Sequence, residues 1–142
     1  MKQHYYLPVT DPEGFNKLLE LEDFMEKIEW LTPYKYLIKI RASQLNKCAY
    51  CLNMHSKEAL EKGENAKRLT LLNAWKEATA FDEKEKIILD FTQKFTIVNQ
   101  AGLNDKLFQQ ASAHFDNKQL AQLAMAIGII NLWNRVVLCS GI

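Results

Sequence analysis

Apolar residues recur at steps of three and four along most of this chain, the spacing that places them on one face of an α-helix. No stretch shows the alternation of apolar and polar residues that is typical of a half-buried strand. Most apolar segments follow a residue that can cap a helix or end at a glycine. The expected helices begin at Asp11-Pro12, Thr32-Pro33, Cys48, Asn65, Asp82, Asn104 and Asn117. We therefore predict an all-α domain of about six to eight helices.

The last predicted helix, Leu120 to about Leu138, is apolar nearly all round between Leu123 and Leu132. A helix of this kind is buried, either in a protein core or in an interface between subunits. Complete burial of one helix is hard to achieve within a single chain of 142 residues. We therefore expect the domain to form oligomers.

Length and charge narrow the class of protein. A chain of 142 residues is typical of one domain, so we expect a single domain over residues 1–142. The 18 basic and 17 acidic residues nearly cancel, which argues against nucleic-acid and membrane-surface partners. The longest nearly apolar stretch, Leu123 to Trp133, is shorter than the roughly 20 residues that cross a bilayer. The polar N-terminus does not resemble a signal peptide, and we expect a soluble cytoplasmic protein.

Two cysteines and a histidine form the motif that carries chemistry. Cys48 and Cys51 are three residues apart, and His55 follows four residues later. In a helix these three residues share one face. A helix start stabilises a thiolate, and a nearby imidazole can take the thiol proton. Residues three apart on a helix are also close enough for a disulfide.

Three interpretations of this motif compete. The first is a redox-active dithiol with a histidine partner, which we favour. The second is an open zinc site with two cysteines and one histidine, although no second pair of ligands follows. The third is a core face on which two buried thiols and a hydrogen-bonded histidine happen to meet. Cys139 is expected to take no part.

The sequence around the motif resembles a known family. The stretch Arg41–Ala59, which contains Asn46-Lys47-Cys48-Ala49-Tyr50-Cys51 and His55, is similar to the core of the AhpD-like proteins. These belong to the carboxymuconolactone decarboxylase superfamily. The similarity continues in Leu72–Glu77 and in the closing segment Asn131-Leu132-Trp133-Asn134-Arg135. It therefore covers nearly the whole chain.

This resemblance implies an AhpD-like helical fold, assembled as a homo-trimer or homo-hexamer. It implies a thiol-dependent peroxidase or disulfide oxidoreductase that needs no cofactor or metal. Cys51 would attack the hydroperoxide, Cys48 would resolve the sulfenic acid, and His55 would belong to the proton relay. A dithiol protein or small thiol would then reduce the disulfide.

Two positions depart from the family pattern. Tyr36 stands where the AhpD peroxidases carry a relay glutamate, twelve residues before the first cysteine. Tyr50 replaces a histidine that precedes the second cysteine in those enzymes. A phenol with a pKa near 10 is a poor base at neutral pH, though it can hold a hydrogen bond. Glu29 and Glu58 are the other candidate bases.

Other functions remain open at this point. One is a thiol redox sensor or an interaction subunit without enzymatic activity. Another is a cofactor-free lactone decarboxylase, although those enzymes typically lack the two cysteines. Trp75, Trp133 and Tyr34 are expected in the core. The polar residues Asn131, Asn134 and Arg135 are expected to form hydrogen bonds between helices or subunits.

Overall fold

The computed structural model describes residues 2–100 and 102–141, and this part of the chain is helical without strands. It contains eight α-helices and two short 3₁₀ helices, which confirms the all-α prediction. The α-helices are α1 (Leu7–Thr10), α2 (Pro12–Glu26), α3 (Lys35–Leu45), α4 (Ala49–Glu61), α5 (Ala66–Leu71), α6 (Glu83–Thr96), α7 (Asp105–Ser112) and α8 (Asn117–Ser140). The 3₁₀ helices are Glu29–Leu31 and Leu72–Ala74.

Side chains cap most of the predicted helix starts. The Asp11 carboxylate accepts a hydrogen bond from the backbone N–H of Gly14 at the start of α2. Asp82 forms a capping box with Glu85 at the start of α6. Two starts were predicted wrongly. The segment after Thr32 turns before α3 begins at Lys35, and α8 is capped by Asp116 rather than Asn117.

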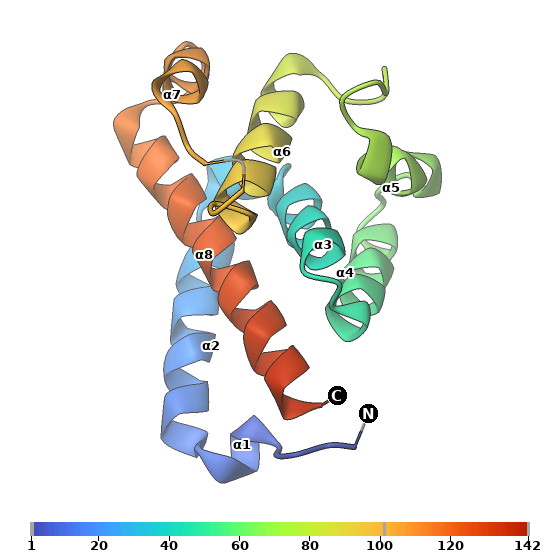
Figure 1. The fold of residues 1–142 in the computed structure, drawn as a ribbon, viewed down its shortest axis with the longest axis vertical. Coiled ribbons are helices and arrows are strands. Elements are labelled where there is room, and N and C mark those ends of the chain that lie inside the picture. Colours follow the sequence, from blue (N-terminus) through green and yellow to red (C-terminus); the bar gives the residue numbers. More distant parts are fainter. Residues whose placement is uncertain (1, 101, 142) are drawn as a thin grey trace.

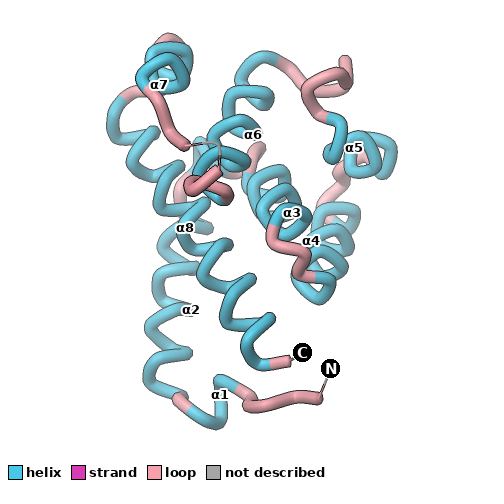
Figure 2. Tube along the Cα trace, in the orientation of Figure 1, coloured by secondary structure: helices cyan, strands magenta, loops and turns pink. Residues whose placement is uncertain are grey.

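The long helix α8 is the axis of the fold (Figure 1). It packs against α2, α3, α4, α6 and α7, and α3 is packed between it, α4 and α6. Figure 2 shows the two ends of the chain close together below α8. The backbone N–H of His4 donates to the carbonyl of Ser140 at 2.7 Å, so the N-terminal segment is tied to the end of α8. This arrangement brings α1, α2, α4 and the second half of α8 around one space.

Helix α8 is long and apolar enough to span a bilayer by length and composition alone. One face of it is buried in the domain through Leu123, Ile127 and Ile130. Two other apolar side chains, Met125 and Leu132, are 42% and 39% exposed. The burial of one face against five other helices is that of a central core helix. The remaining face is available for contact with another subunit.

Candidate functional site

A tight turn between α3 and α4 places the first cysteine at a helix start. Lys47 in this turn has a positive φ of 56°, a conformation that costs a side-chain-bearing residue about 1 kcal/mol or more. The backbone N–H of Cys48 then donates to the carbonyl of Ser43 at 3.0 Å. Cys48 is the N-cap of α4, and its Sγ lies 3.4 Å from the backbone nitrogen of Cys51. The turn therefore directs both cysteines to the N-terminus of α4.

Buried amides hold this turn against α8. The Asn46 side-chain nitrogen donates to the Oδ1 atoms of Asn131 at 3.0 Å and Asn134 at 2.9 Å. The Asn134 nitrogen donates to the Ser43 hydroxyl at 3.0 Å. The expected hydrogen bonding between helices is confirmed for these two asparagines. Arg135 instead bonds Asn131 within α8, at its carbonyl and its Oδ1.

The two cysteines of the motif form a disulfide in the structure. Their Cα atoms are 5.4 Å apart, within the ordinary range for a bridge. Both residues are buried, with 1% of Cys48 and 2% of Cys51 exposed. Cys139 is an exposed free cysteine remote from the pair in sequence. The pairing agrees with the redox-active dithiol interpretation.

A cavity of about 520 Å³ lies beside Cys51. It also brings together two other predicted site residues, His55 and Tyr36. Cys48 is not among the described residues that line it, so Cys51 is the cysteine on the cavity side. The other polar residues of the lining include Glu22, Glu26, Lys39, Tyr50 and Glu58. The apolar lining includes Phe15, Leu19, Met54, Ile130, Trp133 and Val136.

His55 is paired with a carboxylate one turn further along α4. Its Nδ1 lies 3.0 Å from Oε2 of Glu58. Burial lowers the pKa of His55 below its ordinary value, and the nearby Lys39 ammonium lowers it further, while Glu58 opposes the shift. The imidazole is therefore neutral at pH 7. Because the carboxylate accepts from Nδ1–H, the other ring nitrogen, Nε2, keeps its lone pair.

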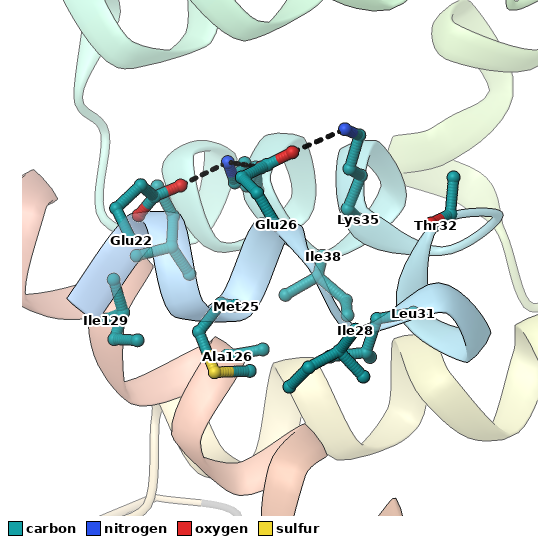
Figure 3. A pocket seen from close by; sticks show the side chains of 12 residues that line it. Glu22, Met25, Glu26, Ile28, Leu31, Thr32, Lys35, Ile38, Ala126 and Ile129 are labelled. Atoms are coloured by element: carbon teal, nitrogen blue, oxygen red, sulfur yellow. Dashed lines mark hydrogen bonds and ion pairs between the residues drawn. The ribbon is translucent and has the colours of Figure 1, made fainter. Parts of the chain in front are cut away.

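A row of ion pairs runs between α2 and α3 (Figure 3). Figure 3 draws a separate, smaller pocket that is also lined by Met25 and Ile38. Glu22, Glu26 and Lys39 of the row line the cavity beside Cys51 as well. Lys39 contacts Glu22 and lies 2.8 Å from Glu26, and Lys35 lies 2.6 Å from the other oxygen of Glu26. Burial disfavours both charged forms, but the contacts outweigh it: the pKa of Lys39 is raised and that of Glu26 is lowered. The Trp133 indole N–H donates to Glu22 at 3.2 Å. Lys39 and Glu26 are therefore charged at neutral pH.

Comparisons with known proteins agree with the resemblance seen in the sequence. A profile of the carboxymuconolactone decarboxylase family matches residues 32–94, which include both cysteines and His55. A solved structure from Agrobacterium tumefaciens matches with a TM-score of 0.93 at 30% identity, over 98% of this chain and 95% of that one. The chain belongs to the carboxymuconolactone decarboxylase family and has the AhpD-like fold. The Agrobacterium protein is ATU0492, of unknown function and proposed to be the antioxidant defence protein AhpD.

Two bacterial relatives of this family member also match. The uncharacterized protein YdfG of Bacillus subtilis is 32% identical over 92% of this chain and 88% of its own length. The uncharacterized protein YnjA of Escherichia coli is 25% identical over 68% of this chain, and the match spans 52% of YnjA. Their descriptions give no activity, so the chemistry must be argued from the site.

Three residues of this family member were not identified as site residues from the sequence. Trp133 packs against the core, as expected, but it also lines the cavity. Glu22 and Lys39 were not identified, although Glu22 lies on the same helical face as Phe15 and Leu19. An acid that continues an apolar face is a signal that could have indicated a buried ion pair. Of the two candidate bases, Glu58 contacts His55, whereas Glu29 is not among the described lining residues.

Proposed function

We propose that this protein is a thiol-dependent peroxidase and disulfide oxidoreductase that reduces hydroperoxides with the Cys48–Cys51 dithiol. The proposal depends mainly on one observation: Cys51, already paired with Cys48, lines a cavity that also contains the neutral His55. A thiol in the first turn of a helix that shares a cavity with a neutral imidazole has the environment of a reactive cysteine.

The first steps use the cysteine and the histidine. Nε2 of His55 accepts the proton of the reduced Cys51 thiol, and Glu58 stabilises the imidazolium. The thiolate attacks one peroxide oxygen, so that an S–O bond forms and the O–O bond breaks. The alkoxide leaves and takes the proton from His55 to become an alcohol. Cys51 is then a sulfenic acid, oxidised by two electrons.

The remaining steps restore the dithiol. The Cys48 thiol attacks the sulfur of Cys51, the disulfide forms, and the hydroxyl leaves as water with the proton of Cys48. A dithiol protein or small thiol then returns two electrons and two protons by thiol–disulfide exchange. We place this cycle in the cytoplasm, where such reductants are kept reduced.

Tyr36 is proposed to hold the peroxide by a hydrogen bond, because its phenol lines the same cavity. The proton-accepting role then falls to the His55–Glu58 pair. Tyr36→Phe is expected to raise KM for the hydroperoxide and leave the pH–rate profile unchanged. A shifted pH–rate profile would instead place the phenol in the proton relay.

The assignment of the cysteines is tested by single-turnover oxidation in a Cys139→Ser background. Cys48→Ser is expected to form one sulfenic acid with cumene hydroperoxide, detected by intact mass after dimedone trapping. Cys51→Ser is expected to react slowly or not at all. If only Cys51→Ser forms the sulfenic acid, the two roles are reversed. Complete inertness of both thiols in the reduced protein would refute the peroxidase.

Turnover separates the enzyme from a redox sensor. With an excess of dithiothreitol, the peroxidase is expected to consume many equivalents of hydroperoxide. A sensor would be oxidised once and then stop. We also propose a homo-trimer or homo-hexamer formed through the exposed face of α8, which contains Met125 and Leu132. A monomeric mass by light scattering at micromolar concentration would contradict this assembly.

A further inference from the structure

The cavity beside Cys51 changes character along one face of α2. Phe15, Leu19, Glu22 and Glu26 are spaced three or four residues apart, and all four line the cavity. The first two are apolar and the last two are acidic. Trp133 contacts both the apolar and the acidic residues of this face. Its ring packs edge-on against Phe15, with the ring centroids 6.1 Å apart, and its N–H donates to Glu22. The cavity therefore has an apolar end and an acidic end.

The apolar end is formed by several elements. Trp133 and Val136 of α8 and Leu7 and Pro8 of α1 line the cavity together with Phe15 and Leu19 of α2. These side chains offer no charge and few hydrogen-bonding groups. Such a surface accommodates a hydrocarbon or aromatic substituent.

The acidic end has more negative than positive charge. Glu22, Glu26 and Glu58 supply three carboxylates to the described lining, and Lys39 supplies one ammonium group. Lys39 is already in contact with both Glu22 and Glu26. Lys35, outside the lining, is paired with Glu26 and still leaves one negative charge in excess. A ligand carboxylate would therefore meet unbalanced negative charge and lysines that are already paired.

We propose that this cavity selects hydroperoxides with an uncharged apolar substituent and discriminates against those that carry a carboxylate. This inference rests on the proposed peroxidase function and adds the chemical class of its substrate. Like charges brought together in a partly dehydrated site disfavour binding strongly. We expect the discrimination to be about tenfold or more in the rate of Cys51 oxidation.

A matched pair of substrates isolates the charge. Cumene hydroperoxide that carries a para-carboxylate differs from its methyl ester mainly in one negative charge. Disulfide formation in the reduced protein is followed by intact mass in single-turnover reactions at pH 7. The rate of each substrate with the protein is divided by its rate with free dithiothreitol, which corrects for intrinsic reactivity. After this correction the ester is expected to react at least about tenfold faster than the acid. Equal rates, or a faster acid, would overturn the inference.

Two variants connect the selection to the acidic wall. Glu22→Gln removes one carboxylate from the lining, and the ester-to-acid ratio is expected to fall severalfold. Glu20→Gln, at an exposed position of α2 outside the described lining, is the control and should keep the wild-type ratio. An unchanged ratio in Glu22→Gln would refute the role of this wall.

Binding of non-reactive analogues separates this inference from the proposed function. Methyl 4-isopropylbenzoate and 4-isopropylbenzoate are titrated against the protein, with tryptophan fluorescence as the readout. Tighter binding of the ester supports the charge selection even if no peroxide is reduced. Equal binding refutes it even if the peroxidase is confirmed. If hydrogen peroxide and cumene hydroperoxide both fail to oxidise Cys51 while the ester still binds better, only the peroxidase proposal is wrong.

Discussion

The amide of Asn134 is expected to be a major stabilising group of the site. Its side chain is fully buried and joins α8 to α3 through Ser43 and to the turn after α3 through Asn46. Asn134→Ala removes the acceptor for one of these hydrogen bonds and the donor for the other. It also leaves a small cavity at the contact between α3 and α8.

The cost can be worked from these contacts. Each lost hydrogen bond contributes about 1 kcal/mol net. Asn46 keeps its bond to Asn131, and the Ser43 hydroxyl keeps its own bond to the carbonyl of Lys39, so neither group is left without a partner. The lost packing adds about 1 kcal/mol. The free energy of unfolding should therefore fall by about 2–4 kcal/mol, which lowers Tm by about 6–12 °C for a domain of this size.

Urea denaturation followed by circular dichroism measures this change in the oxidised protein. Asn53→Ala, the same substitution at an exposed position of α4, is the control and should stay within about 0.5 kcal/mol of the parent. A loss below about 1 kcal/mol in Asn134→Ala would refute the argument that this amide network holds the turn before Cys48.

Three further predictions concern the groups around α4. Burial lowers the pKa of His55, so the imidazole takes up its proton at a higher pH in the unfolded chain than in the folded protein. The free energy of unfolding should therefore fall as the pH drops below about 6.5. A denaturation series from pH 5 to 8 should show a shallower fall for His55→Asn than for the parent. Lys39→Met removes a charge that lowers the pKa of His55, so NMR titration should show a higher His55 pKa. The same change removes the ion-pair partner of Glu22, which keeps only the hydrogen bond from Trp133, and the free energy of unfolding should fall by about 1–3 kcal/mol. Gly63 follows Lys62, the C-cap of α4, and has φ at +91°, so Gly63→Ala should lower the free energy of unfolding by about 1 kcal/mol in urea denaturation.

Local signals in the sequence predicted most of the fold because helix caps act over three or four residues. Asp11, Asp82 and Asn104 each accept a backbone hydrogen bond where a helix was expected to begin. The start after Thr32 failed because the proline there is followed by a turn before α3. The last start was displaced by one residue because Asp116, not Asn117, forms a capping box with Gln119.

The motif on α4 could be predicted for the same local reason, but the rest of the cavity could not. Cys51, His55 and Glu58 follow one another at helical spacing, so their common face is fixed by the helix alone. Glu22 comes from a helix far earlier in the chain and meets Lys39 only after α2 packs against α3. Trp133 lies in an apolar helix, which predicts a core position. That it also lines the cavity depends on how α2 packs against α8. Such contacts are set by tertiary packing.

The charges around the cavity explain why a tyrosine suits position 36 better than a glutamate. The lining already contains the carboxylates of Glu22, Glu26 and Glu58. A fourth carboxylate at position 36 would add another negative charge to a site whose lysines are already paired, and the repulsion would raise the pKa of one acid. A phenol keeps a hydrogen-bonding group there without adding charge. Under the proposed mechanism, Glu58 supplies the carboxylate that supports the base, because it contacts His55 directly from one turn further along α4.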